Sequence, residues 1–162
     1  MIDKKILEFC LYLTPDIIHE NDLTKICIEM LEKNKKNFND QKYGHIVKFN
    51  KIISMVFDEI TLNGNTPICI KANVDTVKPE KDMMFEVEIQ KMMDFGIFAQ
   101  NYNINFWISK DNIDSYEFNS SLNKYKNKNG KELNIGDKIN IKIKLIRYEN
   151  KVYSCIGEFK DE

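Results

Sequence analysis

The alternation of apolar and polar positions predicts one helix near the start of the chain, between segments that favour β-strands. Residues 4–13 are rich in apolar and aromatic side chains and are expected to form a first strand. A helix is expected to begin at Asn21 or Asp22, both good N-caps, and to end near Lys35. It is predicted by apolar residues that recur at intervals of three and four: Leu23, Ile26, Cys27, Met30 and Leu31.

Two further strands are predicted before residue 78. Residues 43–57 are rich in β-branched and aromatic side chains, and residues 66–77 alternate between apolar and polar ones. Asn63-Gly64 lies between these segments and is a strong signal for a tight turn. We therefore expect residues 1–78 to form an α+β domain, in which one helix packs on a small antiparallel sheet.

A short polar segment, residues 78–82, marks the expected domain boundary, so that the second domain spans residues 79–162. Beyond it the helical pattern does not return, and residues 119–134 are polar enough to predict a long loop. Strand signals recur at 84–91, 95–100, 104–109, 138–147 and 151–159. Five short strands in a domain of this size match an all-β OB-fold barrel.

The composition limits the function. The 162 residues include 43% hydrophobic ones, but no segment approaches the roughly 20 apolar residues that a membrane helix needs. The first residues lack the pattern of a signal peptide, so we expect an intracellular protein without a membrane partner. A net charge of −1 argues against coating nucleic acid by bulk electrostatics. Any RNA contact must then depend on a local patch or on aromatic stacking.

No residue pattern indicates catalysis, a metal or a cofactor. Glu86 and Glu88 share one side of a predicted strand, where nearby lysines favour a solvated surface over an acid–base pair. A nucleophile elbow, a glycine-rich phosphate loop and a zinc motif are all missing from the sequence. The cysteines are widely separated, and we expect them to be buried free thiols: Cys10, Cys27, Cys69 and Cys155.

The candidate functional residues are aromatic. Gly96 allows a sharp bend between strands and places Phe95 and Phe98 near the open face of the barrel. Trp107 and Phe106 are neighbours on a strand, so they must face opposite sides. We expect Phe106 in the core and Trp107 at the surface, where it can stack on RNA bases. The alternative, that Phe98 and Trp107 also pack inside the barrel, is open at this stage.

These segments resemble the OB-type RNA-binding repeat of the small-subunit ribosomal protein S-one. The resemblance is carried by Phe95-Gly96-Ile97-Phe98, by Trp107-Ile108-Ser109, and by Gly136-Asp137 before the fourth strand. The repeat usually has a histidine where Trp107 stands, so stacking is kept and a polar group is lost. The resemblance implies RNA binding at Phe95, Phe98 and Trp107. Arg147, near the end of the fourth strand, is expected at the edge of this platform.

The first half, together with the barrel, resembles the stalk subunit of multisubunit DNA-directed RNA polymerases. This is the seventh subunit of eukaryotic polymerase II and its counterpart in the archaeal enzyme. The shared features are Leu13-Thr14-Pro15 before a helix, Lys42-Tyr43-Gly44 at the start of a strand, an Ile-Lys-Ala strand leading to the barrel, and Leu145-Ile146-Arg147 near the end.

That resemblance implies a truncated RNP-like first domain whose tip docks between the polymerase clamp and core. It places Pro15, Tyr43 and Gly44 in or near the tip. It also implies a non-catalytic subunit without cofactors that supports transcription initiation. The implied partners are the core RNA polymerase subunits, the nascent RNA and, in cellular enzymes, a smaller helical stalk subunit.

The short chain and its bias toward Lys, Asn and Ile fit a version encoded by a large DNA virus. The expected location is the nucleus or, for a viral protein, a cytoplasmic virus factory and the virion. The alternative is a stand-alone OB-fold RNA-binding factor in translation or RNA decay. Initiation-factor-like proteins carry the barrel first, and exosome-cap-like proteins follow it with a KH domain.

Overall fold

The computed structural model describes residues 1–161, which form two compact units divided between Lys78 and Pro79. The first unit contains three strands and the α-helices, and the second contains a closed barrel and a small hairpin. Within residues 1–161, no helix is both long and apolar enough to cross a bilayer.

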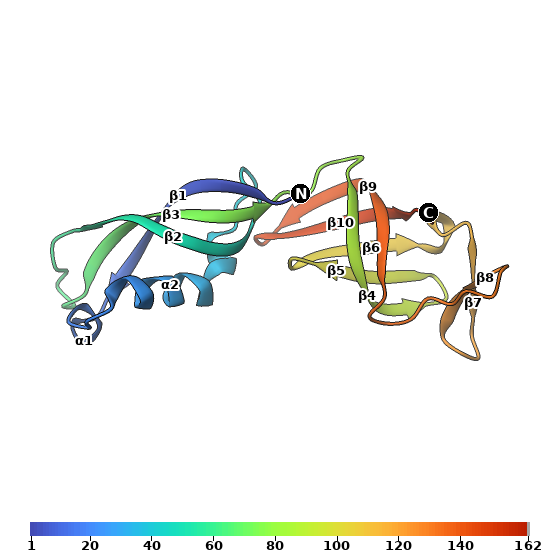
Figure 1. Cartoon of the computed structure of the whole chain (residues 1–162), viewed down its shortest axis with the longest axis horizontal. Helices are drawn as coiled ribbons and strands as arrows, with labels where there is room; N and C mark the ends of the chain where they lie inside the picture. Colours follow the sequence, from blue (N-terminus) through green and yellow to red (C-terminus); the bar gives the residue numbers. More distant parts are fainter. Residues whose placement is uncertain (162) are drawn as a thin grey trace. The chain divides into compact units, whose positions relative to one another are not determined.

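The first unit is an antiparallel sheet with one covered face. Its strands are β1 (Asp3–Leu13), β2 (His45–Phe57) and β3 (Thr66–Val77), in the order β1-β3-β2. Between β1 and β2 lie α1 (Pro15–Ile18), α2 (Leu23–Lys33) and a 3₁₀ turn (Lys35–Phe38). Figure 1 shows α2 lying along one face of the sheet. The predicted strands and the predicted helix are therefore confirmed.

The covered face of the central strand contains the core of this unit. The residues of β3 that the alternation placed on one side are all fully buried: Ile68, Ile70, Ala72 and Val74. Cys27 and Leu31 of α2 are also fully buried and belong to the same cluster. Asp22 caps α2, because its Oδ1 accepts a hydrogen bond from the Lys25 backbone amide at 3.2 Å.

The second unit contains a five-stranded closed barrel. Its strands are β4 (Met84–Met93), β5 (Gly96–Asn101), β6 (Ile104–Ser109), β9 (Lys138–Glu149) and β10 (Val152–Phe159). They pair in the order β10-β6-β5-β4-β9, and β9 closes the barrel against β10. The β6–β10 pair is parallel and the others are antiparallel. This is an OB-like barrel, as the strand pattern predicted.

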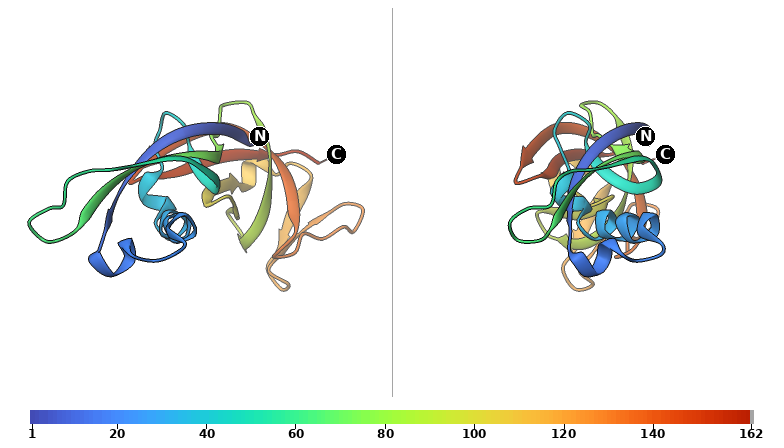
Figure 2. Two further views of the ribbon diagram at one scale, coloured as in Figure 1. Left: turned by 60° about the vertical axis from the view of Figure 1, so that its left-hand side comes forward. Right: turned by 90° about the vertical axis from the view of Figure 1, so that its left-hand side faces the viewer.

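The prediction of one long loop at residues 119–134 was wrong. Two short strands, β7 (Tyr116–Asn119) and β8 (Lys124–Asn127), form a hairpin that projects from the barrel in Figures 1 and 2. The hydroxyl of the buried Tyr125 donates a hydrogen bond to the Met93 carbonyl at 2.6 Å and so anchors the hairpin to β4. Each strand has four residues, too few for an apolar alternation to stand out.

The prediction that all four cysteines are buried was wrong for half of them. Cys27 and Cys155 are buried, and burial raises the pKa of the Cys155 thiol to about 12. Cys10 is exposed and Cys69 is half-buried. They lie opposite each other on β1 and β3. Their neighbours along each strand point to the helix-covered face, so both cysteines point to the other face of the sheet.

Tyr43 and Gly44 hold the start of β2 inside the first unit. Gly44 is buried at φ +92°, and a Cβ atom there would lie 2.3 Å from the Val77 carbonyl oxygen. Its amide donates to the Asp40 carbonyl at 2.8 Å. The Tyr43 hydroxyl donates to the Phe38 carbonyl. Gly44 therefore permits a close approach of the backbone to β3 of its own unit. The expected approach to a partner at this position stays a prediction.

We predict that Gly44→Ala destabilises the first unit. A left-handed alanine is strained by about 1–2 kcal/mol, and the Val77 carbonyl must also move. Gly64→Ala is the control, because Gly64 has φ +79° but its Cβ would meet only the Pro15 ring, at 3.7 Å. Hydrogen exchange of first-unit amides at increasing urea concentrations measures the free energy of unfolding of this unit. It should fall clearly more in Gly44→Ala than in Gly64→Ala. Equal losses of stability in the two variants would show that the close contact between position 44 and the Val77 carbonyl has no effect.

Candidate nucleic-acid interface

Three aromatic side chains form a cluster on the outer surface of β5, β6 and the turn before β5. Phe98 and Trp107 are direct partners in the β5–β6 register, and their ring centroids lie 4.5 Å apart. Phe95 flanks the same indole at 5.5 Å. Phe95 is 54% exposed and Phe98 is 43% exposed, while Trp107 is half-buried between them. We call these three residues the aromatic platform.

The backbone at Gly96 holds the platform together. A Cβ atom at this position would lie 2.5 Å from Cη2 and 2.6 Å from Cζ2 of Trp107. The indole therefore lies directly against the Gly96 backbone. A Cβ would also lie 2.5 Å from the Ile108 carbonyl oxygen, so a side chain here would push against both the indole and the β6 backbone. Gly96 pairs with Ser109, two residues beyond Trp107, so the β5–β6 ladder keeps ring and glycine aligned.

Phe106 faces the other way. It is fully buried and packs on Phe85, with a centroid distance of 5.1 Å. The expectation that Phe106 belongs to the core and Trp107 to the opposite side is confirmed. The open alternative, in which Phe98 packs inside the barrel, is wrong because Phe98 projects outward on an exposed position.

A groove with a mostly apolar lining and a few polar side chains adjoins the platform. It has a volume of about 460 Å³ and is lined by Phe98 and Trp107 together with polar residues: Gln90, Gln100, Asn105 and Ser154. The Gln100 Nε2 donates to the Asn105 Oδ1 at 3.3 Å, across the β5–β6 pair. Our sequence reasoning did not single out these polar residues. Two of them could have been found, since Gln100 and Asn105 lie two positions from Phe98 and Trp107 on the same strand faces.

An apolar row continues the platform across the barrel. Ile156 of β10 pairs in register with Trp107, and Leu145 of β9 pairs with Ile156. Both aliphatic side chains are exposed. Phe98, Trp107, Ile156 and Leu145 thus form one row across four neighbouring strands. The parallel β6–β10 pairing creates this row, and sequence alternation alone did not reveal it.

Arg147 does not contact the platform. It pairs in register with Ser154, which pairs with Asn105, so Arg147 lies two strands from β6, or roughly 10 Å. Its guanidinium forms an ion pair with Glu149 at 2.7 Å and is largely exposed. We call the paired positions Gln100, Asn105, Ser154 and Arg147 the polar row. Arg147 is at the end of this row, away from the aromatic rings.

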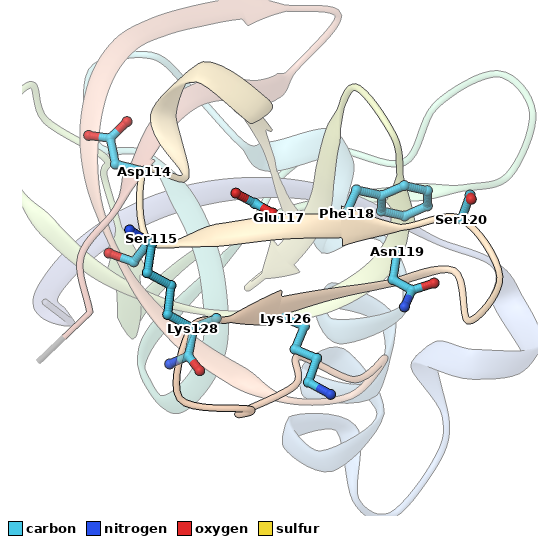
Figure 3. A pocket seen from close by; sticks show the side chains of 9 residues that line it. Asp114, Ser115, Glu117, Phe118, Asn119, Ser120, Lys126 and Lys128 are labelled. Carbon is cyan, nitrogen blue, oxygen red and sulfur yellow. The ribbon is translucent and has the colours of Figure 1, made fainter.

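A second hollow of about 460 Å³ lies at the β7–β8 hairpin. Its charged lining residues are Asp114, Glu117, Lys126 and Lys128. Figure 3 shows the labelled side chains spread along the hairpin without converging on one point. Across residues 1–161, no three His, Cys, Asp or Glu side chains come close enough to hold a metal ion. Glu86 and Glu88 are exposed, and Glu86 pairs with Lys138 at 3.2 Å.

The structure places Pro15 at one end of β3 and Gly44 at the other, although all three docking candidates (Pro15, Tyr43 and Gly44) were expected in or near one tip. Pro15 follows β1 at the end where Leu13 pairs with Thr66, and its ring lies beside Gly64 in the β2–β3 loop. Gly44 lies against Val77, at the other end of β3. The 12 residues of β3 separate the two sites by roughly 35 Å. Figure 1 shows α1, which begins at Pro15, next to the β2–β3 loop.

Comparisons with known proteins add little to this geometry. No family model matches the sequence, and no curated protein matches it. Among solved structures, the apo form of Mycoplasma genitalium RNase R is similar over 48% of this chain, at 23% identity and a TM-score of 0.38. The matched region is only 13% of that protein, and a similarity this weak carries no argument about function.

We predict that Gly96→Ala displaces the indole, because the new methyl group would overlap it. Trp107 is the only tryptophan, so its fluorescence reports the change directly. We expect red-shifted emission and stronger acrylamide quenching. Gly136→Ala is the control, since a Cβ there meets nothing within 4 Å. Unchanged emission in a folded Gly96→Ala variant would show that Gly96 does not position the ring.

Proposed function

We propose that this chain is a non-catalytic stalk subunit of a multisubunit DNA-directed RNA polymerase, and that its barrel binds emerging RNA. The observation that carries the RNA-binding part is the aromatic platform on β5 and β6. In the chain order of the barrel these are the second and third strands, which form the face that OB-folds use for oligonucleotides. Exposed rings at this place offer surfaces on which successive bases can stack.

Stacking is expected to contribute more to RNA affinity than ion pairing. The net charge of the chain is −1, and the guanidinium of Arg147 is already paired with Glu149. Lys91 is exposed and pairs in register with Phe98, while Lys110 follows β6 and is also exposed. These two lysines are the nearest candidates for phosphate contacts. A small number of phosphate contacts predicts a shallow dependence of affinity on salt.

The polar side chains of this groove can supply hydrogen bonds beside the rings. With one Gln100 amide hydrogen donated to the Asn105 Oδ1, the Gln100 Oε1 and the Asn105 Nδ2 remain as an acceptor and a donor. A base stacked on Phe98 and Trp107 would present its edge to these groups. The groove thus provides the polar contacts that the replacement of the family histidine by Trp107 removes.

The architecture of the first unit supports the stalk assignment. Its order of strand, helix, strand, strand equals the first four of the six elements in the βαββαβ arrangement, which is what a truncated RNP-like domain would retain. The β2–β3 loop beside Pro15 exposes two large aliphatic side chains, Ile60 at 70% and Leu62 at 108%. We place the polymerase-docking tip at this loop and Pro15, since exposed apolar side chains on a turn favour burial against a partner.

We predict that Trp107→Ala weakens binding of single-stranded RNA by about 1–3 kcal/mol without unfolding the protein. Fluorescence anisotropy of a labelled oligonucleotide measures the affinity, and thermal unfolding checks the fold. Tyr12→Ala is the control, because it removes an exposed aromatic ring from the first unit. Equal affinities of a folded Trp107→Ala variant and the wild type would contradict the platform. Equal losses of RNA affinity in Trp107→Ala and Tyr12→Ala would also contradict the platform.

We predict that Leu62→Asp releases the chain from its polymerase. A carboxylate at this position would have to be buried at the docking surface. The tagged chain, expressed in its natural host, should co-purify with the two very large polymerase subunits, and Leu62→Asp should abolish this. Leu122→Asp is the control, since Leu122 is exposed on the turn of the β7–β8 hairpin. Co-purification with ribosomes would instead favour a stand-alone translation factor.

A further inference from the structure

Two thiols meet on the sheet face that α2 does not cover. Cys10 of β1 and Cys69 of β3 are direct partners in the antiparallel register. Their Sγ atoms lie 3.3 Å apart, close enough for one thiol to donate a hydrogen bond to the other. The two residues are 59 positions apart in the chain, so the contact comes from strand pairing and not from sequence proximity.

The geometry suits a covalent bond. Directly opposed residues of an antiparallel pair have Cα atoms about 4.5–5.5 Å apart, which falls inside the range observed for disulfides. Small side-chain rotations would bring the sulfur atoms to bonding distance while the β1–β3 ladder stays intact. Cys10 lies on an edge strand and is exposed, so a small oxidant can reach it.

We propose that Cys10 and Cys69 form a dithiol site that peroxide oxidises to a reversible cross-strand disulfide. The Cys10 thiolate attacks one oxygen of hydrogen peroxide and becomes a sulfenic acid, while the other oxygen leaves as hydroxide and takes up a proton to form water. The Cys69 sulfur then attacks the Cys10 sulfur and forms the S–S bond. The sulfenic oxygen leaves as a second water molecule. Two thiols and one peroxide thus give one disulfide and two waters.

The surroundings assign the two roles. The hydrogen bond with Cys10 is the main cause that raises the pKa of the Cys69 thiol, and the carboxylates of Glu8 and Asp58 act in the same direction. Cys10 is also exposed while Cys69 is half-buried, so peroxide reaches the Cys10 sulfur first. Once Cys10 is oxidised, the negative sulfur that opposed ionisation of Cys69 is gone. Cys10 is then the attacking thiol and Cys69 the resolving one.

The remaining thiols provide an internal comparison. Cys27 and Cys155 are buried in the cores of the first and second units, and burial raises the pKa of both thiols. Nucleophilic attack on peroxide requires an accessible thiolate. These two cysteines should therefore survive oxidant concentrations that convert the pair.

The test treats the full-length protein with hydrogen peroxide, alkylates it after unfolding without reduction, and maps the peptides by mass spectrometry. We expect a linked peptide of Cys10 with Cys69, alkylated Cys27 and Cys155, and loss of the link after dithiothreitol. Alkylation of all four cysteines, or cross-links between molecules in place of the internal one, would overturn the proposal.

Two variants test the assigned order of events. In Cys69→Ser, the Cys10 sulfenic acid has no resolving thiol and should accumulate as a dimedone adduct, whereas the wild type should give little. In Cys10→Ser, neither a disulfide nor an adduct should form. A dimedone adduct at Cys69 in Cys10→Ser, as strong as that at Cys10 in Cys69→Ser, would refute the roles.

The oxidised protein should also be more stable. Closing a long loop restricts the unfolded chain, so we expect the first unit to unfold at a temperature higher by about 5 °C or more. Reduction should restore the original midpoint. A disulfide that lowers the unfolding temperature would show that the two strands must distort to make it, and would contradict the preformed geometry.

Discussion

The parallel pairing of β6 with β10 determines which side chains meet on the outer surface of the barrel. Without it, β6 would be the edge strand of an open sheet, and Trp107 would have only β5 beside it. With it, Trp107 lies beside Ile156, and Asn105 lies beside Ser154. An apolar row and a polar row then run side by side across the strands. The proposed RNA surface depends on both, because stacking needs the first and hydrogen bonding to base edges needs the second.

The alternation of side chains along β6 determines which residues face the interior. Because side chains alternate along each strand, the outward position of Trp107 requires Phe106 to point inward, where it packs on Phe85. Gly96 has no side chain, which leaves room for the Trp107 indole on the outer surface of the barrel. A Cβ at Gly157 would likewise meet the Ile141 side chain at 2.7 Å, next to the bulge between β9 and β10. Two glycines therefore allow the barrel to close with large side chains on both surfaces.

The first unit uses its sheet differently. One face holds α2 over the buried apolar residues of the central strand, and the other face carries the Cys10–Cys69 pair. The functional features of this unit lie away from its core. The exposed loop beside Pro15 is at one end of the sheet, while Tyr43 and Gly44 close the other end through internal contacts. The residues that resembled a docking motif therefore divide into one at the proposed tip and two that stabilise the fold.

The sequence by itself determined most of the secondary structure and the buried face of the first unit. Strict alternation identified the buried face of β3, and the adjacency of Phe106 and Trp107 was enough to assign them to opposite sides. It also selected Phe95, Phe98 and Trp107. These properties are local, because the period of a strand or helix places each side chain relative to its neighbours. Strand register and barrel closure are not local, since they depend on which distant strands pair. Only the tertiary structure therefore decided that Ile156 extends the platform, that Arg147 lies two strands from it, and that Cys10 meets Cys69.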